Sequence, residues 1–158
     1  MKIKLFNRFN CTYCGSPCDT RDHVIPVSRE YTSRKNAKTN IRNTVPSCRE
    51  CNTMLGSLLF LTIGDRASYL YTLYKGRFKK LLFMPDWSIE DLDGLKGRLK
   101  QSVRNSVKKK ERAKERIKHI ELVIALCPTI QEVWEIINED NLEEDKIVVG
   151  NENLEVSR

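Results

Sequence analysis

Cys11-Thr-Tyr-Cys14 and Cys48-Arg-Glu-Cys51 bound the stretch of sequence that decides the fold. Each motif places two thiols three positions apart, so that one tight turn can present both to a tetrahedral zinc ion. The 33 residues between Cys14 and Cys48 leave room for a β-hairpin and its loop. A module of about 55 residues buries too little apolar surface to be secure alone, which gives a structural metal a physical purpose. We therefore predict that these four cysteines bind structural Zn²⁺, with Cys18 as a bystander thiol or an alternative to Cys14.

Four residues between and just after these motifs are the candidates for chemistry. Asp22 and His23 fall in the apolar run that ends Val24-Ile-Pro26, Asn43 opens the run Asn-Thr-Val-Pro46, and Asn52 follows the last cysteine. We expect a strand over 21–27, a return strand over 43–46, and a helix from Cys48 to about residue 57. Neighbouring side chains of a strand point to opposite faces, so Asp22 and His23 act side by side only if the strand bends.

This order of motifs resembles the HNH endonucleases, and in particular the small HNH proteins of bacteriophages. The resemblance covers residues 8–57. It implies a ββα-metal fold that hydrolyses DNA, in which Asp22 and Asn52 hold a catalytic Mg²⁺ or Mn²⁺ ion. It also implies His23 as the general base and Asn43 as the residue that fixes the His23 ring. The chain departs from the family pattern at Asn52, where histidine is frequent, and at 53–56, which lack the usual Lys-Gly.

The chemistry of these residue types agrees with that role. Histidine, whose ordinary pKa is about 6.5, can take a proton from water at neutral pH. Oxygen ligands suit Mg²⁺, which stabilises the charge that develops on phosphate. The alternative is a zinc module in which the four residues are ordinary hydrogen-bonding groups of turns.

The charge distribution indicates a polyanionic partner. The formal net charge is +7, and residues 96–118 contain eleven Lys/Arg against two Glu, whereas residues 132–157 contain nine Asp/Glu against one Lys. We predict contacts with duplex DNA, mostly to phosphates. The alternative is a solvated helix beside a solubilising tail. The predicted contacts are Arg34, Lys35, Lys38, Arg42, Arg49, Lys100, Arg104, Lys108, Lys109, Lys110, Arg112, Lys114 and Arg116.

Composition narrows the class of protein. No apolar run approaches the roughly 20 residues of a membrane span, and the N-terminus lacks the apolar core of a signal peptide. We expect a cytoplasmic protein of a bacterial or phage-infected cell, where thiols stay reduced.

The rest of the chain is predicted to be mainly helical. Apolar spacing predicts a helix over 66–82 with Asp65 as its N-cap, and a capping box at Ser88 opens a second helix that continues to Leu126. Another capping box at Thr129 opens a short helix, and residues 3–10 favour a short strand. The predicted fold class is α+β, with a zinc-bound HNH nuclease domain (1–57), a helical DNA-binding extension (58–140) and an acidic tail (141–158).

We expect a metal-dependent DNA endonuclease. The rival hypotheses are a non-catalytic, zinc-nucleated DNA-binding accessory protein and an RNA-directed nuclease. The sequence leaves open whether the chain forms a homo-oligomer.

Overall fold

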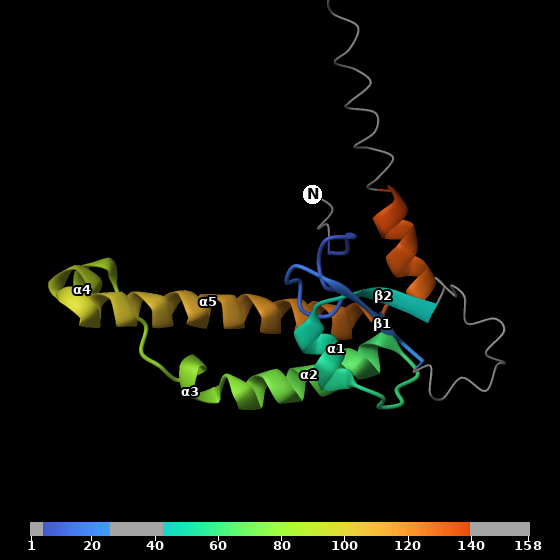
Figure 1. Ribbon diagram of the computed structural model, residues 1–158, viewed down its shortest axis with the longest axis horizontal. Coiled ribbons are helices and arrows are strands. Elements are labelled where there is room, and N and C mark those ends of the chain that lie inside the picture. The colour runs from blue at the N-terminus through green and yellow to red at the C-terminus, as the bar shows by residue number, and fades with distance from the viewer. Residues whose placement is uncertain (1–4, 26–42, 140–158) are drawn as a thin grey trace, which may run out of the picture.

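The computed structural model describes residues 5–25 and 43–139. Its first elements are the strands β1 (Thr20–His23) and β2 (Thr44–Ser47) and the helix α1 (Arg49–Leu55). The two strands are antiparallel, and Asp22 lies opposite Val45. Hairpin followed by helix is the predicted ββα order, and the helices that follow confirm the α+β class (Figure 1).

The second cysteine motif begins α1. Cys48 is the N-cap, and its thiol accepts a hydrogen bond from the backbone N–H of Cys51. The same turn therefore caps the helix and directs two thiols to one side of it. The helix ends at Gly56, whose φ of 49° favours glycine.

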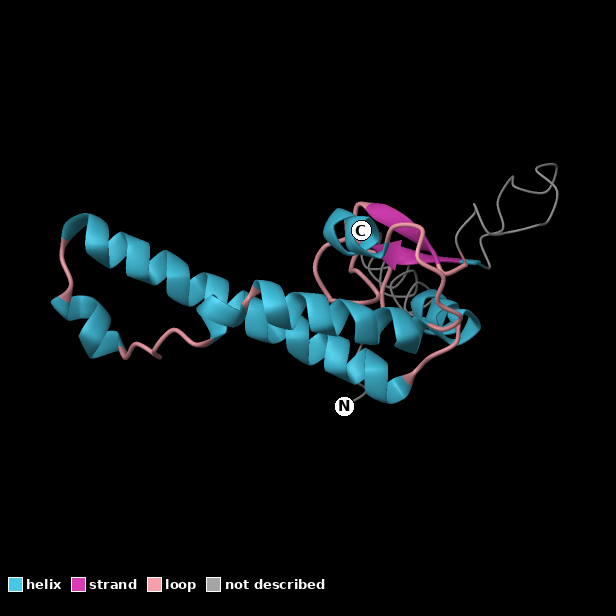
Figure 2. Cartoon of the chain, turned by 90° about the horizontal axis from the view of Figure 1, so that it is seen from below, coloured by secondary structure: helices cyan, strands magenta, loops and turns pink. Residues whose placement is uncertain are grey.

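The cysteine turns, the hairpin and α1 (residues 5–25 and 43–56) together form what is called the hairpin domain below. Five helical segments follow it. They are α2 (Ile63–Arg77), α3 (Lys79–Leu82), α4 (Ile89–Gly94), α5 (Gly97–Leu126) and a C-terminal helix over residues 130–139. The helices α2 and α5 pack along each other, and α5 extends beyond α2 as an arm that carries α3 and α4 (Figure 2).

Several sequence predictions need correction at the ends of elements. Residues 5–10 form no strand, apart from one isolated bridge between Asn10 and Pro17. Thr62, not Asp65, caps α2, because its hydroxyl accepts from the Asp65 N–H. The helix predicted from Ser88 to Leu126 is interrupted at 95–96, before Gly97 with a φ of 57°. The capping box at Ser88 is confirmed.

Helices α2 and α5 support the metal-binding end of the chain. Gly15 has a φ of 70°, and a Cβ there would lie 2.7 Å from Nδ1 of His119, so the first cysteine turn packs directly on α5. On the second turn, Glu50 accepts hydrogen bonds from Arg77 at 2.6 Å and from Arg116 at 2.5 Å. The predicted boundary near residue 57 is therefore crossed by many contacts. The cysteine turns, α2 and α5 share one core.

Candidate metal centre and catalytic face

The four cysteines of the two motifs come together as predicted. The sulfur atoms of Cys11, Cys14, Cys48 and Cys51 lie within 4.8 Å of one another, and all four residues are buried. Cys18 lies outside this group, and its thiol donates to the backbone carbonyl of Arg8 at 3.0 Å. Four convergent sulfur atoms from two turns suit tetrahedral Zn²⁺.

The thiols compete for protons at this distance. Hydrogen bonding among the four raises the pKa of Cys11 and Cys51 and lowers the pKa of Cys14 and Cys48. A divalent cation removes the competition, because it favours the thiolate at every position. The donor set therefore fits a structural zinc ion.

Two contacts hold the thiols in place. The Tyr74 hydroxyl of α2 lies 3.4 Å from the sulfur of Cys51. The backbone N–H of Thr12 donates to the carbonyl of Pro46 at 2.9 Å, which joins the first turn to β2. The metal centre is thereby tied to both the hairpin and the helical extension.

Asp22 lies inside the core. It is 2% exposed, and its Oδ1 accepts from Nη2 of Arg66 at 2.8 Å. Its Oδ2 accepts from the hydroxyl of Tyr13 at 2.5 Å. Arg66 is fully buried and also donates to the carbonyl of Val24 at 2.8 Å. Burial raises the pKa of the Asp22 carboxyl, and the hydrogen bond from Tyr13 and the charge of Arg66 oppose that rise.

These contacts do not fit the predicted role of Asp22 as a ligand of Mg²⁺ or Mn²⁺. Each carboxylate oxygen already accepts a hydrogen bond, and the carboxylate is closed off from solvent. The Arg66 guanidinium also supplies the positive charge that a metal ion would bring, so a second cation at that place would be repelled. The sequence could not reveal this, because Arg66 lies 44 positions away on α2.

His23 takes the opposite orientation. The side chains of β1 alternate, so that Asp22 is buried while His23 and Arg21 are exposed. The strand does not turn Asp22 and His23 to one side. His23 therefore reaches solvent at the end of β1, where it can contact a bound substrate.

Asn43 serves the backbone of the hairpin. Its Oδ1 accepts from the Ile25 N–H at 3.1 Å, and its Nδ2 donates to the Ile25 carbonyl at 3.0 Å. Within residues 5–25 and 43–139, no hydrogen bond joins the Asn43 and His23 side chains. Asn43 thus closes the base of the hairpin beyond His23, in place of the predicted contact with the ring.

Asn52 lies half-buried on α1, beside the start of β1. Its Nδ2 donates to the Arg21 carbonyl at 3.2 Å and lies 3.4 Å from the Thr20 hydroxyl. Its amide oxygen accepts no hydrogen bond from the part of the chain that the structure describes. One amide oxygen is a weak ligand for a hard cation, and the Asp22 carboxylate is already bonded to Arg66 and Tyr13, so the role of this pair in holding a divalent cation stays a prediction.

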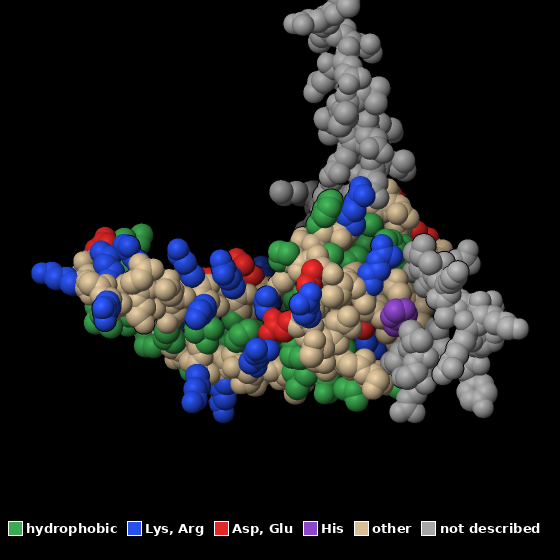
Figure 3. Space-filling model, viewed as in Figure 1, with side chains coloured by type: hydrophobic (Ala, Val, Ile, Leu, Met, Phe, Trp, Pro, Cys, Tyr) green, Lys and Arg blue, Asp and Glu red, His purple; other side chains and the backbone are tan. Residues whose placement is uncertain are grey.

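The predicted DNA-contacting side chains divide into two groups. Figure 3 shows Lys and Arg side chains spread over the arm and the hairpin domain, on a face that also carries a histidine. The side chains of Lys108, Lys109 and Arg112 are exposed and form no ion pair with any described residue. In contrast, Lys110 is 4% exposed and donates to Asp86 at 2.6 Å and to the Met84 carbonyl. The prediction for Lys110 is therefore corrected, since its charge fastens the 84–88 loop to α5.

The remaining predicted contacts are occupied or lie outside the described residues. Arg49 pairs with Asp19, Lys100 and Arg104 pair with Asp93, Lys114 pairs with Asp86 and Glu111, and Arg116 pairs with Glu50. The exposed pairs among these are weak and can be exchanged for phosphate, whereas the side chains of Arg116 and Glu50 are only 28% exposed. Arg34, Lys35, Lys38 and Arg42 lie outside the described part of the chain.

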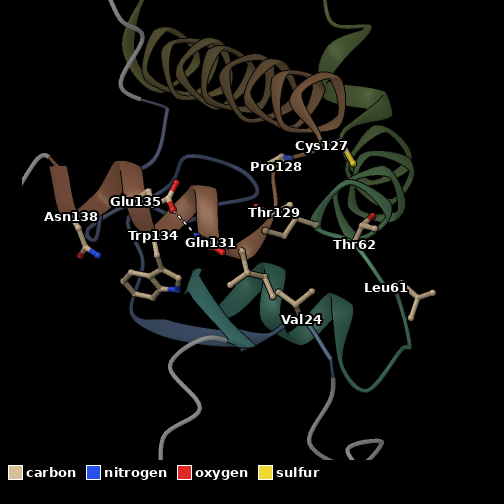
Figure 4. A pocket seen from close by; sticks show the side chains of 12 residues that line it. Val24, Leu61, Thr62, Cys127, Pro128, Thr129, Gln131, Trp134, Glu135 and Asn138 are labelled. Atoms are coloured by element: carbon tan, nitrogen blue, oxygen red, sulfur yellow. Dashed lines mark hydrogen bonds between the residues drawn. The ribbon is translucent and has the colours of Figure 1, made fainter.

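A mostly apolar hollow of about 980 Å³ opens between the start of α2 and the C-terminal helix (Figure 4). Its lining includes Val24, Leu61, Ile130 and Trp134, and no Lys, Arg or His of the part of the chain that the structure describes. It is therefore unsuited to a polyanion, although the indole N–H of Trp134 at its border donates to the carbonyl of Thr44, the cross-strand partner of His23.

Comparison with known proteins agrees with this geometry. The model of the HNH endonuclease family matches residues 11–58, which contain the four cysteines, the hairpin and α1. No curated protein and no solved structure matches the chain. No described helix is long and apolar enough to span a membrane. The match covers less than a third of the chain: residues 11–58 are similar to an HNH endonuclease domain, and their four cysteines are positioned to bind a metal ion.

Proposed function

We propose that the chain is an endonuclease that hydrolyses phosphodiester bonds of double-stranded DNA, with His23 as the general base. The observation that carries the proposal is the exposed histidine at the end of β1, within a segment that matches the HNH family and is joined to a four-cysteine metal centre. The match to the HNH family model supports a nuclease in general, and the DNA substrate and the role of His23 are part of the proposal.

The proposed chemistry requires a water molecule beside the phosphate. The imidazole of His23 would take a proton from this water as the water oxygen bonds to phosphorus, while the bond from phosphorus to the leaving sugar oxygen breaks and that oxygen takes a proton from solvent. A general base of this kind contributes roughly 10²–10⁴-fold to a rate. The rigid support of β1 favours such a role: the Asp22–Arg66 ion pair holds its inner face, and Asn52 binds the Arg21 carbonyl. Both contacts limit the movement of the strand that presents His23.

Zinc supplies structure in this proposal. Chelation by four thiolates leaves no open coordination position for substrate or water. The role of Asp22 as a ligand of Mg²⁺ or Mn²⁺ is not carried into the proposal, because its carboxylate is buried and bonded to Arg66 and Tyr13.

The arm supports the nucleic-acid part of the proposal. It adds Lys108, Lys109 and Arg112 to the positive charge of the hairpin domain, and exposed Lys and Arg bind phosphates without reading sequence. We propose the reducing cytoplasm of a bacterial or phage-infected cell as its location, because thiols stay reduced there and available to zinc.

A second candidate function is a non-catalytic, zinc-nucleated DNA-binding accessory protein. It is favoured by one observation, the withdrawal of the Asp22 carboxylate into an ion pair with Arg66. Under this hypothesis the HNH domain keeps its fold and its contact with DNA but has lost hydrolysis.

One experiment separates the two. Zinc-loaded wild type and His23→Ala, matched in zinc content, are incubated with supercoiled plasmid in Mg²⁺, in Mn²⁺ and without added metal, and the same samples are run in a gel-shift assay. The endonuclease proposal predicts that wild type cuts the plasmid while His23→Ala only shifts it. If both proteins shift the plasmid and neither cuts it in any buffer, the accessory function is correct. Competition by RNA tests the substrate class, and preferential cutting of RNA would replace DNA in the proposal.

A further inference from the structure

Arg21 on β1 has no role in the sequence motifs or in the family match. It is exposed, it lies two residues before His23 on β1, and strand alternation puts both side chains on the face opposite Asp22. Two residues of a strand span about 6.6 Å, so one phosphodiester group can lie against both side chains.

The cross-strand neighbours define this face more fully. Arg21 lies opposite Pro46 and His23 lies opposite Thr44. Trp134 of the C-terminal helix extends toward the hairpin (Figure 4), and its indole N–H donates to the Thr44 carbonyl at 2.8 Å. The indole is therefore fixed next to the cross-strand partner of His23.

The same ring holds Arg21. The guanidinium carbon of Arg21 lies 5.4 Å from the centre of the Trp134 ring, within the range of a cation–π contact. Stacking uses the face of a guanidinium and leaves the N–H groups at its edge available for two hydrogen bonds to phosphate. The Arg21 backbone is also held, because its carbonyl accepts from Asn52 at 3.2 Å. Both contacts restrict Arg21, one at its guanidinium and one at its backbone.

The surroundings of Arg21 suit an anion. A hollow of about 200 Å³ lies beside it, and the guanidinium-bearing residues Arg8 and Arg21 and the ring of Trp134 contribute to its lining. Among residues 5–25 and 43–139, no Asp or Glu lines this hollow. The nearest described carboxylate on β1, that of Asp22, faces the core.

We propose that Arg21 contacts a phosphate of the nucleic acid next to the bond that is cut, and that Trp134 is the positioning residue that holds its guanidinium there. This inference rests on the proposed nuclease function. In this proposal the positive charge at the phosphate comes from Arg21. The Asp22 carboxylate is bonded to Arg66 in the core, so no metal ion bound to Asp22 is needed to supply that charge. It also gives the C-terminal helix a role in the reaction.

The test compares Arg21→Ala, Arg21→Lys and Trp134→Leu with wild type on a labelled DNA duplex. Arg98→Ala serves as the matched control, because Arg98 is an exposed arginine at the start of α5. All proteins are matched in zinc content and in unfolding midpoint. The readouts are the maximal single-turnover rate and the DNA concentration that gives half of it.

We expect Arg21→Ala to lower the maximal rate at least 10-fold, Arg21→Lys to recover part of the loss, and added guanidinium ion to restore part of the rate of Arg21→Ala only. Trp134→Leu should lower the rate less than Arg21→Ala does, and Arg21→Ala combined with Trp134→Leu should be no slower than Arg21→Ala, because the ring acts through Arg21. A maximal rate of Arg21→Ala equal to that of Arg98→Ala and wild type overturns the proposal.

Failure of the nuclease function itself gives a different result. If wild type does not cut, the subsite is tested by binding alone: Arg21→Ala should weaken DNA affinity and reduce the slope of log affinity against log salt by about one, as expected for one lost phosphate contact. Unchanged affinity and slope in Arg21→Ala would then exclude the subsite.

Discussion

The buried pair of Asp22 and Arg66 gives the sharpest prediction about stability. Replacing Arg66 by methionine removes the guanidinium and leaves the Asp22 carboxylate 2% exposed, with the Tyr13 hydroxyl as its remaining partner among the bonds described. Breaking a buried ion pair from one side costs roughly 3–5 kcal/mol, because the other charge stays in a low-dielectric environment. The carbonyl of Val24 also loses a donor at 2.8 Å. We therefore expect Arg66→Met to lower the free energy of unfolding by about 3–5 kcal/mol.

The assay is urea unfolding of zinc-loaded protein, followed by the fluorescence of the two tryptophans. Asp22→Leu should cost a similar amount, since it leaves the Arg66 charge buried. The double variant Asp22→Leu with Arg66→Met should be much more stable than the sum of the two losses implies, because both charges are gone. A loss below about 1 kcal/mol in Arg66→Met, or two losses that simply add, would refute a buried ion pair between Asp22 and Arg66.

Further predictions concern the arm, the C-terminal helix and zinc. Lys110→Met should lower the free energy of unfolding by roughly 1–3 kcal/mol without changing the salt dependence of DNA binding. Lys109→Met, at an exposed neighbour, should leave stability unchanged and reduce the slope of log affinity against log salt by about one. Equal behaviour of the two variants in both assays would contradict a structural role for Lys110 and a phosphate contact for Lys109. The backbone N–H and hydroxyl of Thr129, at the start of the C-terminal helix, donate to the Glu132 carboxylate and lower its pKa. The stabilisation that this carboxylate gives the helix is therefore present at neutral pH and is lost as the pH falls through the lowered pKa, and we expect the fluorescence of Trp134 on that helix to change with it. Glu132→Gln should remove this acid-dependent change in Trp134 fluorescence, and a change that persists in the variant would count against the cap. Replacing Cys48 by serine should reduce zinc affinity and expose the hairpin domain to proteolysis, whereas unchanged zinc content would show that the four-cysteine site is wrong.

The sequence was sufficient for the features that depend on local spacing. The two cysteine motifs predict their own turns, and the cap of α1 follows from the same residues, so the metal centre and the ββα order could be derived before the structure. The capping box at Ser88 is equally local and is confirmed. Interruptions within helices were harder to place. The helix predicted from Ser88 to Leu126 is divided before Gly97, which has a positive φ, and the presence of a glycine in a sequence does not by itself show that its φ is positive.

The candidate site depended on contacts between distant segments, and there the sequence was less informative. Strand alternation predicted that Asp22 and His23 would face opposite ways, but only the fold shows that Asp22 faces Arg66. Similarly, Lys110 belongs to a run of exposed-looking lysines, and its burial depends on a loop 24 positions earlier that carries Asp86. Arg21 was missed because nothing nearby in sequence marks it; its partner Trp134 comes from the other end of the described chain.

The central claim is that His23 acts as the base of a nuclease. The most direct test is the single-turnover rate at which zinc-loaded wild type and His23→Ala, matched in zinc content and DNA affinity, cut a defined DNA duplex. The role of His23 as general base predicts cleavage by wild type and a loss of roughly 10²–10⁴-fold in His23→Ala. Cleavage by His23→Ala at the wild-type rate would contradict it.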